Sequence, residues 1–130
     1  MEIIVGDDVL LRRIVHFHVI EVGQSKRRRI SSAAFKPNRK PEEISVDLGR
    51  LTTPEKTLER SGKPLLGVVS LKAQVPLALG MEVKHDPNPP DDPDNEAHTL
   101  IIGENTKSRR DALASAAEIS ILPGAKVADS

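Results

Sequence analysis

The stretch MEVKHDPNPPDDPDNEAHTLII, residues 81–102, decides how the sheet of this chain is expected to fold. Two apolar segments, MEVKH at 81–85 and AHTLII at 97–102, flank a connector that holds four prolines and five acidic residues. Proline fixes φ and removes a backbone donor, so the connector favours an extended conformation and is expected to project from the surface. The stretch therefore predicts two hairpin strands joined by a solvated connector.

Three further segments have the character of β-strands. Residues 43–48, EISVDL, alternate apolar and polar side chains, which predicts a strand with one buried face. Residues 65–72, LLGVVSLK, are apolar almost throughout, which is typical of a central strand. Residues 9–22 also favour a single strand, in which His16 and His18 share one half-exposed polar face.

Two helices are predicted, one from the signals at its ends and one from the spacing of its side chains. Thr53 is a favourable N-cap and Pro54 suits the first helical position, so a short helix begins there and ends before Gly62. A second helix, from residue 106 or 107 to residue 119, is indicated by small and apolar side chains that recur every three or four residues.

Together these segments predict an α+β fold, with a mainly antiparallel sheet of about five or six short strands and two helices. The segment 30–35, ISSAAF, fits either a strand or the first turn of a helix, and both alternatives stay open. Pro123 and Gly124 end the regular pattern. We therefore expect a single α+β domain over residues 1–122 and a flexible C-terminal tail over residues 123–130.

The composition excludes several classes of chemistry. The chain has no cysteine, which excludes disulfides, thiolate catalysis and cysteine-bound metal clusters. Phe17 and Phe35 are the only aromatic residues, so the rings that stack nucleobases are scarce. The net charge of zero also argues against a nucleic-acid partner.

Charge is nevertheless divided along the chain. Residues 1–65 hold 13 Lys or Arg and 9 Asp or Glu, whereas residues 66–130 hold 6 and 10. If the two halves present separate faces, the molecule carries a basic and an acidic pole that can attract a protein partner; if they fold against each other, the charges simply complement one another.

The N-terminus lacks a basic start followed by an apolar run, and no apolar segment is long enough to span a bilayer, so we expect a cytoplasmic protein with no membrane partner.

The two histidines of the opening stretch raise the question of a metal site. If their strands pair, His85 and His98 come close to Asp86 and offer three ligands. The spacing matches no ligand motif, however, and the connector lacks the glycine of an EF-hand loop. The sequence therefore predicts no metal, and it indicates no particular cofactor.

His98-Thr99-Leu100 resembles one half of the paired His-x-Thr signature of two-histidine phosphoesterases, in which each histidine activates or protonates an oxygen at a phosphate, although Thr99 follows His98 directly and Leu100 stands in the place of the signature's Thr. The second half would be His16 or His18, and neither is followed two places on by Thr or Ser. The resemblance implies an acid–base role for His98 alone.

A set of cations and hydroxyls in the first half could hold a phosphate-bearing substrate, because guanidinium groups bind phosphate oxygens in pairs. The same set suits a transferase of ADP-ribose, which needs an early Arg, a central Ser and a late acid such as Glu96. The candidates for such an enzyme site are Ser31, Ser32, Asp47 and His98 as catalytic residues and Arg12 and Arg29 as phosphate-binding residues.

The chain also resembles a group of short, uncharacterised bacterial proteins. The segments that carry this resemblance are LLRRI at 10–14, RISSAAF at 29–35, EISVDL at 43–48, TPEKTL at 53–58, GVVSL at 67–71, HDP at 85–87 and EAHTLIIG at 96–103. It implies a compact bacterial single-domain protein and implies no activity. The chain departs from the pattern of the group at Glu96, where proline is usual, so no role for the connector carries over.

Two functions follow as hypotheses. The first is a small binding or accessory module that recognises a protein partner through its charged poles. The second is an enzyme that acts on a nucleotide or another phosphate-bearing substrate, and it requires His98, Ser31 and an arginine to meet in one concave site.

Overall fold

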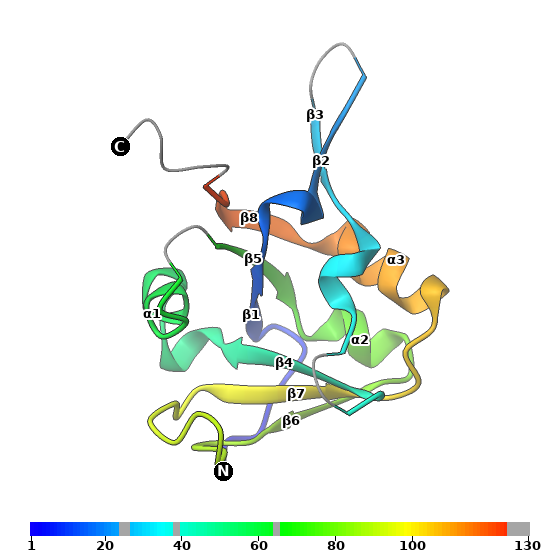
Figure 1. Cartoon of the computed structure of the whole chain (residues 1–130). Coiled ribbons are helices and arrows are strands. Elements are labelled where there is room, and N and C mark those ends of the chain that lie inside the picture. The colour runs from blue at the N-terminus through cyan, green and yellow to red at the C-terminus, as the bar shows by residue number, and fades with distance from the viewer. Residues whose placement is uncertain (24–26, 38–39, 64–65, 125–130) are drawn as a thin grey trace.

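The computed structural model describes residues 1–23, 27–37, 40–63 and 66–124. As predicted, the fold is α+β and its main sheet is antiparallel throughout (Figure 1). In spatial order the six strands of this sheet are β6 (Glu82–His85), β7 (His98–Ile102), β4 (Glu43–Leu48), β1 (Val9–Ile14), β5 (Gly67–Lys72) and β8 (Glu118–Ile121). The six strands agree with the predicted sheet of about five or six, and the separate hairpin of β2 (Val19–Val22) and β3 (Arg27–Ile30) brings the strands of the described residues to eight.

The hydrophobic core lies on one face of the sheet, as the alternation of β4 predicts. Ile44, Val46 and Leu48 of β4 are buried in it, whereas Ser45 and Asp47 belong to the opposite face. The core is closed by α3 (Lys107–Ala116), α2 (Gln74–Ala78) and a 3₁₀ turn, η2 (Ser32–Phe35). The helix α1 (Pro54–Glu59) contacts the sheet through β1 and β5, and its buried Thr57 meets Asp47 on the opposite face.

Both predicted helix starts are confirmed by their caps. The hydroxyl of Thr53 accepts a hydrogen bond from the backbone N–H of Lys56 at 3.1 Å, and the hydroxyl of Thr106 accepts one from the backbone N–H of Arg109 at 3.1 Å.

Among the described residues, none of the helices is long and apolar enough to cross a membrane.

The prediction of one strand over residues 9–22 is wrong. The chain turns after β1 through a short 3₁₀ segment, η1 (His16–His18), and β2 then pairs with β3 in a hairpin that stands apart from the main sheet (Figure 1). The turn is closed by two bonds, from His18 N–H to the Val15 carbonyl and from Val15 N–H to His18 Nδ1. These local bonds override the alternating pattern, so His16 and His18 do not share a strand face.

The open alternative at residues 30–35 is resolved in favour of a helical turn. Ile30 ends β3, and the Ser31 hydroxyl accepts a hydrogen bond from Ala33 N–H at the start of η2. The turn places Phe35 in the core, where it is fully buried. The Ser31 hydroxyl, predicted for a catalytic site, thus serves as the acceptor at the start of η2.

The last predicted helix is too long. It ends at Ala116, and Glu118–Ile121 forms the edge strand β8 instead, paired with β5. Close approach of the two strands requires Gly67, because a Cβ on this residue would lie 2.4 Å from the Ile121 carbonyl oxygen. Pro123, the first residue of the predicted tail, is buried, and residues 125–130 of that tail lie outside the described residues.

The acidic connector between β6 and β7 packs against the body of the molecule at its buried residues, where it differs from the prediction that it projects. Its other side chains include six exposed ones: Asn88, Pro90, Asp91, Pro93, Asp94 and Glu96. Pro89, Asn95 and Ala97 are buried. The Asn95 side-chain amide donates to Asp47 at 2.8 Å and to Asp92 at 3.0 Å, which ties the connector to β4. Because Asn95 is buried and its side-chain amide is hydrogen-bonded, the connector is held against the sheet at this residue.

Candidate functional site

Two hollows in the surface gather the charged and polar side chains of the described residues. The first, which we call the sheet-face hollow, has a volume of about 380 Å³ and lies on the face of the sheet that carries Ser45, beside α1. Its polar lining comes from segments far apart in the sequence and includes Arg13, His18, Ser45, Thr57, Lys63 and His98. Three residues of the predicted enzyme site, Arg12, Asp47 and His98, line this hollow.

Arg12 has a structural role. Its buried guanidinium donates to three backbone carbonyls, those of Ala34 at 3.0 Å, Ser45 at 2.7 Å and Lys36 at 2.8 Å. Loss of hydration, together with the nearby charge of Arg13, lowers the pKa of Arg12 to about 10, so the group is still a cation at neutral pH. Because its donors are engaged by η2 and β4, Arg12 is not available to hold a phosphate group.

Asp47 is engaged in the same way. Its buried carboxylate accepts hydrogen bonds from Thr57 at 2.8 Å, Arg60 at 2.7 Å and Asn95 at 2.8 Å. It therefore joins β4 to α1 and to the connector. A carboxylate whose oxygens are engaged by several donors in this way has little capacity left to bond a substrate.

His98 is differently placed, because it bonds side chains rather than only the backbone. Its Nε2 lies 3.2 Å from the hydroxyl oxygen of Ser45, and its Nδ1 lies 3.1 Å from a carboxylate oxygen of Asp86. Sequence reasoning missed Ser45. The signal that could have found it is the register of β4 and β7, which pairs Asp47 with His98 and so sets Ser45 on the same face.

His85, Asp86 and His98, the residues that would be the ligands if the chain held a metal, do not come together as three ligands. In the sheet His85 pairs with Thr99, so His85 and His98 belong to opposite faces. Both ring nitrogens of His85 already bond the backbone, Nδ1 with the N–H of Glu2 and Nε2 with the carbonyl of Glu96. Among the described residues there is no cluster of three or more His, Asp or Glu side chains that could hold a metal ion.

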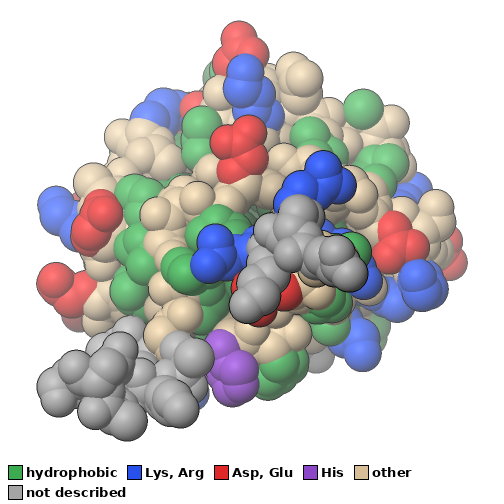
Figure 2. Space-filling model, turned by 90° about the horizontal axis from the view of Figure 1, so that it is seen from above, with side chains coloured by type: hydrophobic (Ala, Val, Ile, Leu, Met, Phe, Trp, Pro, Cys, Tyr) green, Lys and Arg blue, Asp and Glu red, His purple; other side chains and the backbone are tan. Residues whose placement is uncertain are grey.

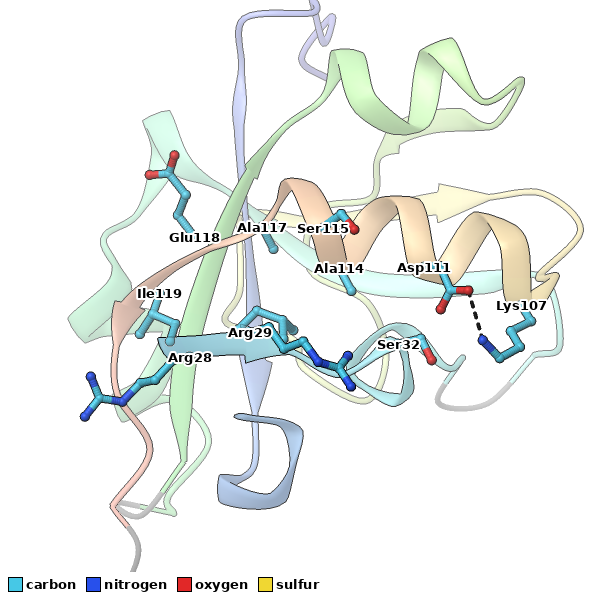
Figure 3. Close-up of a pocket in the computed structure, with 11 residues that line it drawn as sticks. Arg28, Arg29, Ser32, Lys107, Asp111, Ala114, Ser115, Ala117, Glu118 and Ile119 are labelled. Atoms are coloured by element: carbon cyan, nitrogen blue, oxygen red, sulfur yellow. Dashed lines mark hydrogen bonds and ion pairs between the residues drawn. The ribbon is translucent and has the colours of Figure 1, made fainter. Parts of the chain in front are cut away.

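The second hollow, which we call the arginine hollow, has a volume of about 670 Å³ and lies between the hairpin strand β3, helix α3 and edge strand β8 (Figure 3). Arg28 and Arg29 line it from β3, together with Ser32 of η2. Its apolar lining consists of Ile30, Ala114, Ala117 and Ile119. Arg29 and Ser32, both predicted for the enzyme site, are thus placed here and not in the sheet-face hollow.

The charged groups of the arginine hollow differ in how they are engaged. Lys107 donates to Asp111 at 2.9 Å, and this hydrogen bond is the main cause of the lowered pKa of Asp111, to which Ser32 also contributes. In the part of the chain that the structure describes, the side chains of Arg28 and Arg29 make no hydrogen bond or ion pair, and both are exposed. Figure 2 shows the face around the hairpin, where Lys and Arg side chains gather beside apolar ones.

The predicted enzyme site is therefore divided. Arg12, Asp47 and His98 line the sheet-face hollow, whereas Arg29 and Ser32 line the arginine hollow. Ser31 caps η2, and Glu96 is exposed on the connector; neither lines these two hollows.

Comparisons of the chain with protein-family models, curated proteins and solved structures found no match.

Proposed function

We propose that this protein is a bacterial cytoplasmic binding module that recognises an acidic segment of a protein partner in the arginine hollow. The observation that carries the proposal is the pair Arg28 and Arg29, two exposed guanidinium groups without a bond to another described residue, which extend in different directions from β3 and line a hollow that also has apolar side chains (Figure 3). Guanidinium groups bind carboxylates in two-point contacts, and arginine is enriched where protein interfaces concentrate their binding energy.

The shape of the hollow supports a peptide segment better than a flat contact. Its volume of about 670 Å³ lies within the range of about 300–1,000 Å³ typical of ligand sites. Ile30 and Ala114, which are buried, and Ile119, which is half-buried, offer apolar contacts below the arginines. A partner segment with acidic residues next to aliphatic ones would match the arginines and the apolar side chains, provided that its acids lie away from Asp111 and Glu118, which also line the hollow.

Affinity purification from the native host, followed by mass spectrometry, tests the proposal. The wild type is compared with the double variant Arg28→Ser/Arg29→Ser. The matched control is Lys56→Ser/Lys84→Ser, which removes the same charge at two exposed positions outside the hollow. We expect a stoichiometric partner with the wild type and the control, and its loss with the arginine variant.

Binding of the isolated partner is then measured by isothermal titration. Loss of two central arginines is expected to weaken binding by at least about 2 kcal/mol, and rising salt is expected to weaken wild-type binding. Equal affinity of the arginine variant and the lysine control would exclude the arginine hollow as the binding site.

A further inference from the structure

Three side chains form a continuous row of hydrogen bonds: Ser45 and His98, which line the sheet-face hollow, and Asp86, which does not line it but bonds His98. The Nδ1 atom of His98 lies 3.1 Å from both the carbonyl oxygen and a carboxylate oxygen of Asp86. Both are acceptors, so Nδ1 carries the proton of the neutral ring. Nε2 then presents its lone pair to Ser45, and the Ser45 hydroxyl, 3.2 Å away, donates to it. This is the order of nucleophile, base and orienting carboxylate that activates a serine hydroxyl.

The backbone holds this row in place. Residues 45 and 98 lie on the neighbouring strands β4 and β7, whose register pairs Asp47 with His98. Asp86 directly follows β6, and its backbone N–H donates to the carbonyl of His98 at 2.8 Å. Strand pairing thus sets the positions of residues 45 and 98, and Asp86 is held next to them by its backbone bond at the end of β6. Groups held on paired strands are more rigid than groups on loops.

The surroundings of Ser45 suit an anionic substrate. Ser45 is half-buried and lines the hollow, and the exposed cations Arg13 and Lys63 line it as well. The buried guanidinium of Arg12 bonds the backbone carbonyl of Ser45 and adds a fixed positive charge nearby. Positive charge at such a place attracts anions and stabilises the oxyanion that develops when a hydroxyl attacks a carbonyl group.

We propose that the sheet-face hollow is an esterase site, in which Ser45 is the nucleophile, His98 the general base and Asp86 a positioning residue, and that its substrates are carboxylic esters that carry a negative charge. The Ser45 oxygen forms a bond to the acyl carbon while its proton passes to His98 Nε2. The bond from the acyl carbon to the alcohol oxygen breaks, and the alcohol leaves with that proton.

Water completes the reaction. A water molecule adds to the acyl carbon and gives a proton to His98 Nε2, the bond between the acyl carbon and Ser45 breaks, and Ser45 regains the proton. The sum is ester plus water giving acid plus alcohol, with no other reactant. The site is distinct from the arginine hollow, so this inference stands or falls independently of the proposed partner binding.

Covalent labelling of the full chain with a fluorophosphonate probe tests the nucleophile, because this reagent bonds activated serine hydroxyls with loss of fluoride. Peptide mass spectrometry is expected to place the label on Ser45 of the wild type and to find none in Ser45→Ala. Ser70→Ala is the matched control, since Ser70 is a half-exposed serine of the same sheet that does not line this hollow, and it should label like the wild type. His98→Gln is expected to slow labelling by at least about 100-fold.

Hydrolysis of mono(4-nitrophenyl) succinate and of neutral 4-nitrophenyl acetate tests the substrate class. Arg13→Gln and Lys63→Gln are expected to raise KM for the anionic ester and to leave KM for the neutral ester unchanged. Asp86→Asn is expected to lower kcat about tenfold at unchanged KM, a modest loss because the Asp86 backbone carbonyl still holds Nδ1.

Unfolding in urea confirms that each variant is folded. The proposal is overturned if the folded wild type labels no more at Ser45 than at Ser70, or if Ser45→Ala hydrolyses both esters as fast as the wild type. Faster hydrolysis of the neutral ester than of the anionic one would overturn the assigned substrate class.

Discussion

The sheet-face hollow and the arginine hollow contain similar residue types but use them differently. In the first, Arg12 and Asp47 are buried and bonded to several partners each, so they stabilise the fold. In the second, Arg28 and Arg29 are exposed and bond to none of the described residues. The difference teaches that a charged residue type does not indicate a binding role until its donors and acceptors have been counted.

The largest expected effect is that of Arg12→Ala on stability. Three backbone carbonyls lose their donor and the site loses a buried charge, so we expect a decrease of about 3–5 kcal/mol in the free energy of unfolding. Arg13→Ala, at the exposed neighbour, should change it by less than about 0.5 kcal/mol. Urea unfolding measures both. If the two variants are equally stable, Arg12 is not the structural residue that we describe.

Asp47→Asn is expected to cost less, about 2 kcal/mol, because the charged hydrogen bond with Arg60 is weakened and an amide group faces the Asn95 amide. Thr57→Val removes only one neutral hydrogen bond and should cost about 1 kcal/mol. The double variant is expected to be less destabilised than the sum of the two, because both residues belong to one network. If the destabilisation of the double variant equals the sum of the two single values, the two residues do not belong to one network.

Gly67→Ala affects the two hollows unequally. The new Cβ would meet the Ile121 carbonyl and Pro123, and overpacking of this kind costs about 1–3 kcal/mol. Because β8 supplies Glu118 and Ile119 to the arginine hollow, partner binding should weaken as well. Fluorophosphonate labelling of Ser45 should be unaffected. If Gly67→Ala instead lost the labelling of Ser45 and kept its partner binding, the substitution would affect the sheet-face hollow and not the arginine hollow.

The smallest expected effect is a pH dependence of the free energy of unfolding that arises from His18, which lines the sheet-face hollow. Loss of hydration, and secondarily the charge of Arg12, lowers the pKa of His18 below its ordinary value of 6.5. The unfolded chain therefore takes up this proton first, so wild-type stability should fall relative to His18→Gln as pH drops through 6.5 toward the lowered pKa. Urea unfolding between pH 8 and pH 5 measures the difference; a constant difference would contradict the assigned shift.

Local patterns predicted much of the fold. The alternation of residues 43–48 fixed the buried face of β4, and the threonine caps fixed the starts of α1 and α3. Each depends on side chains within a few residues of one another. The predictions failed where a distant contact competed: residues 118–121 left the helix pattern to pair with β5, and Asn95 drew the connector onto Asp47.

The sequence by itself determined the α+β class, the order of most elements and the identity of His98 as a residue of interest. Only the tertiary structure decided what His98 meets. Residues 45 and 98 are brought together by strand register, and a shift of one residue would turn His98 to the opposite face. Register is set by the packing of the whole sheet. For that reason no local sequence pattern could predict the contact of Ser45 with His98 or the hydrogen bonds of Arg12 to backbone carbonyls.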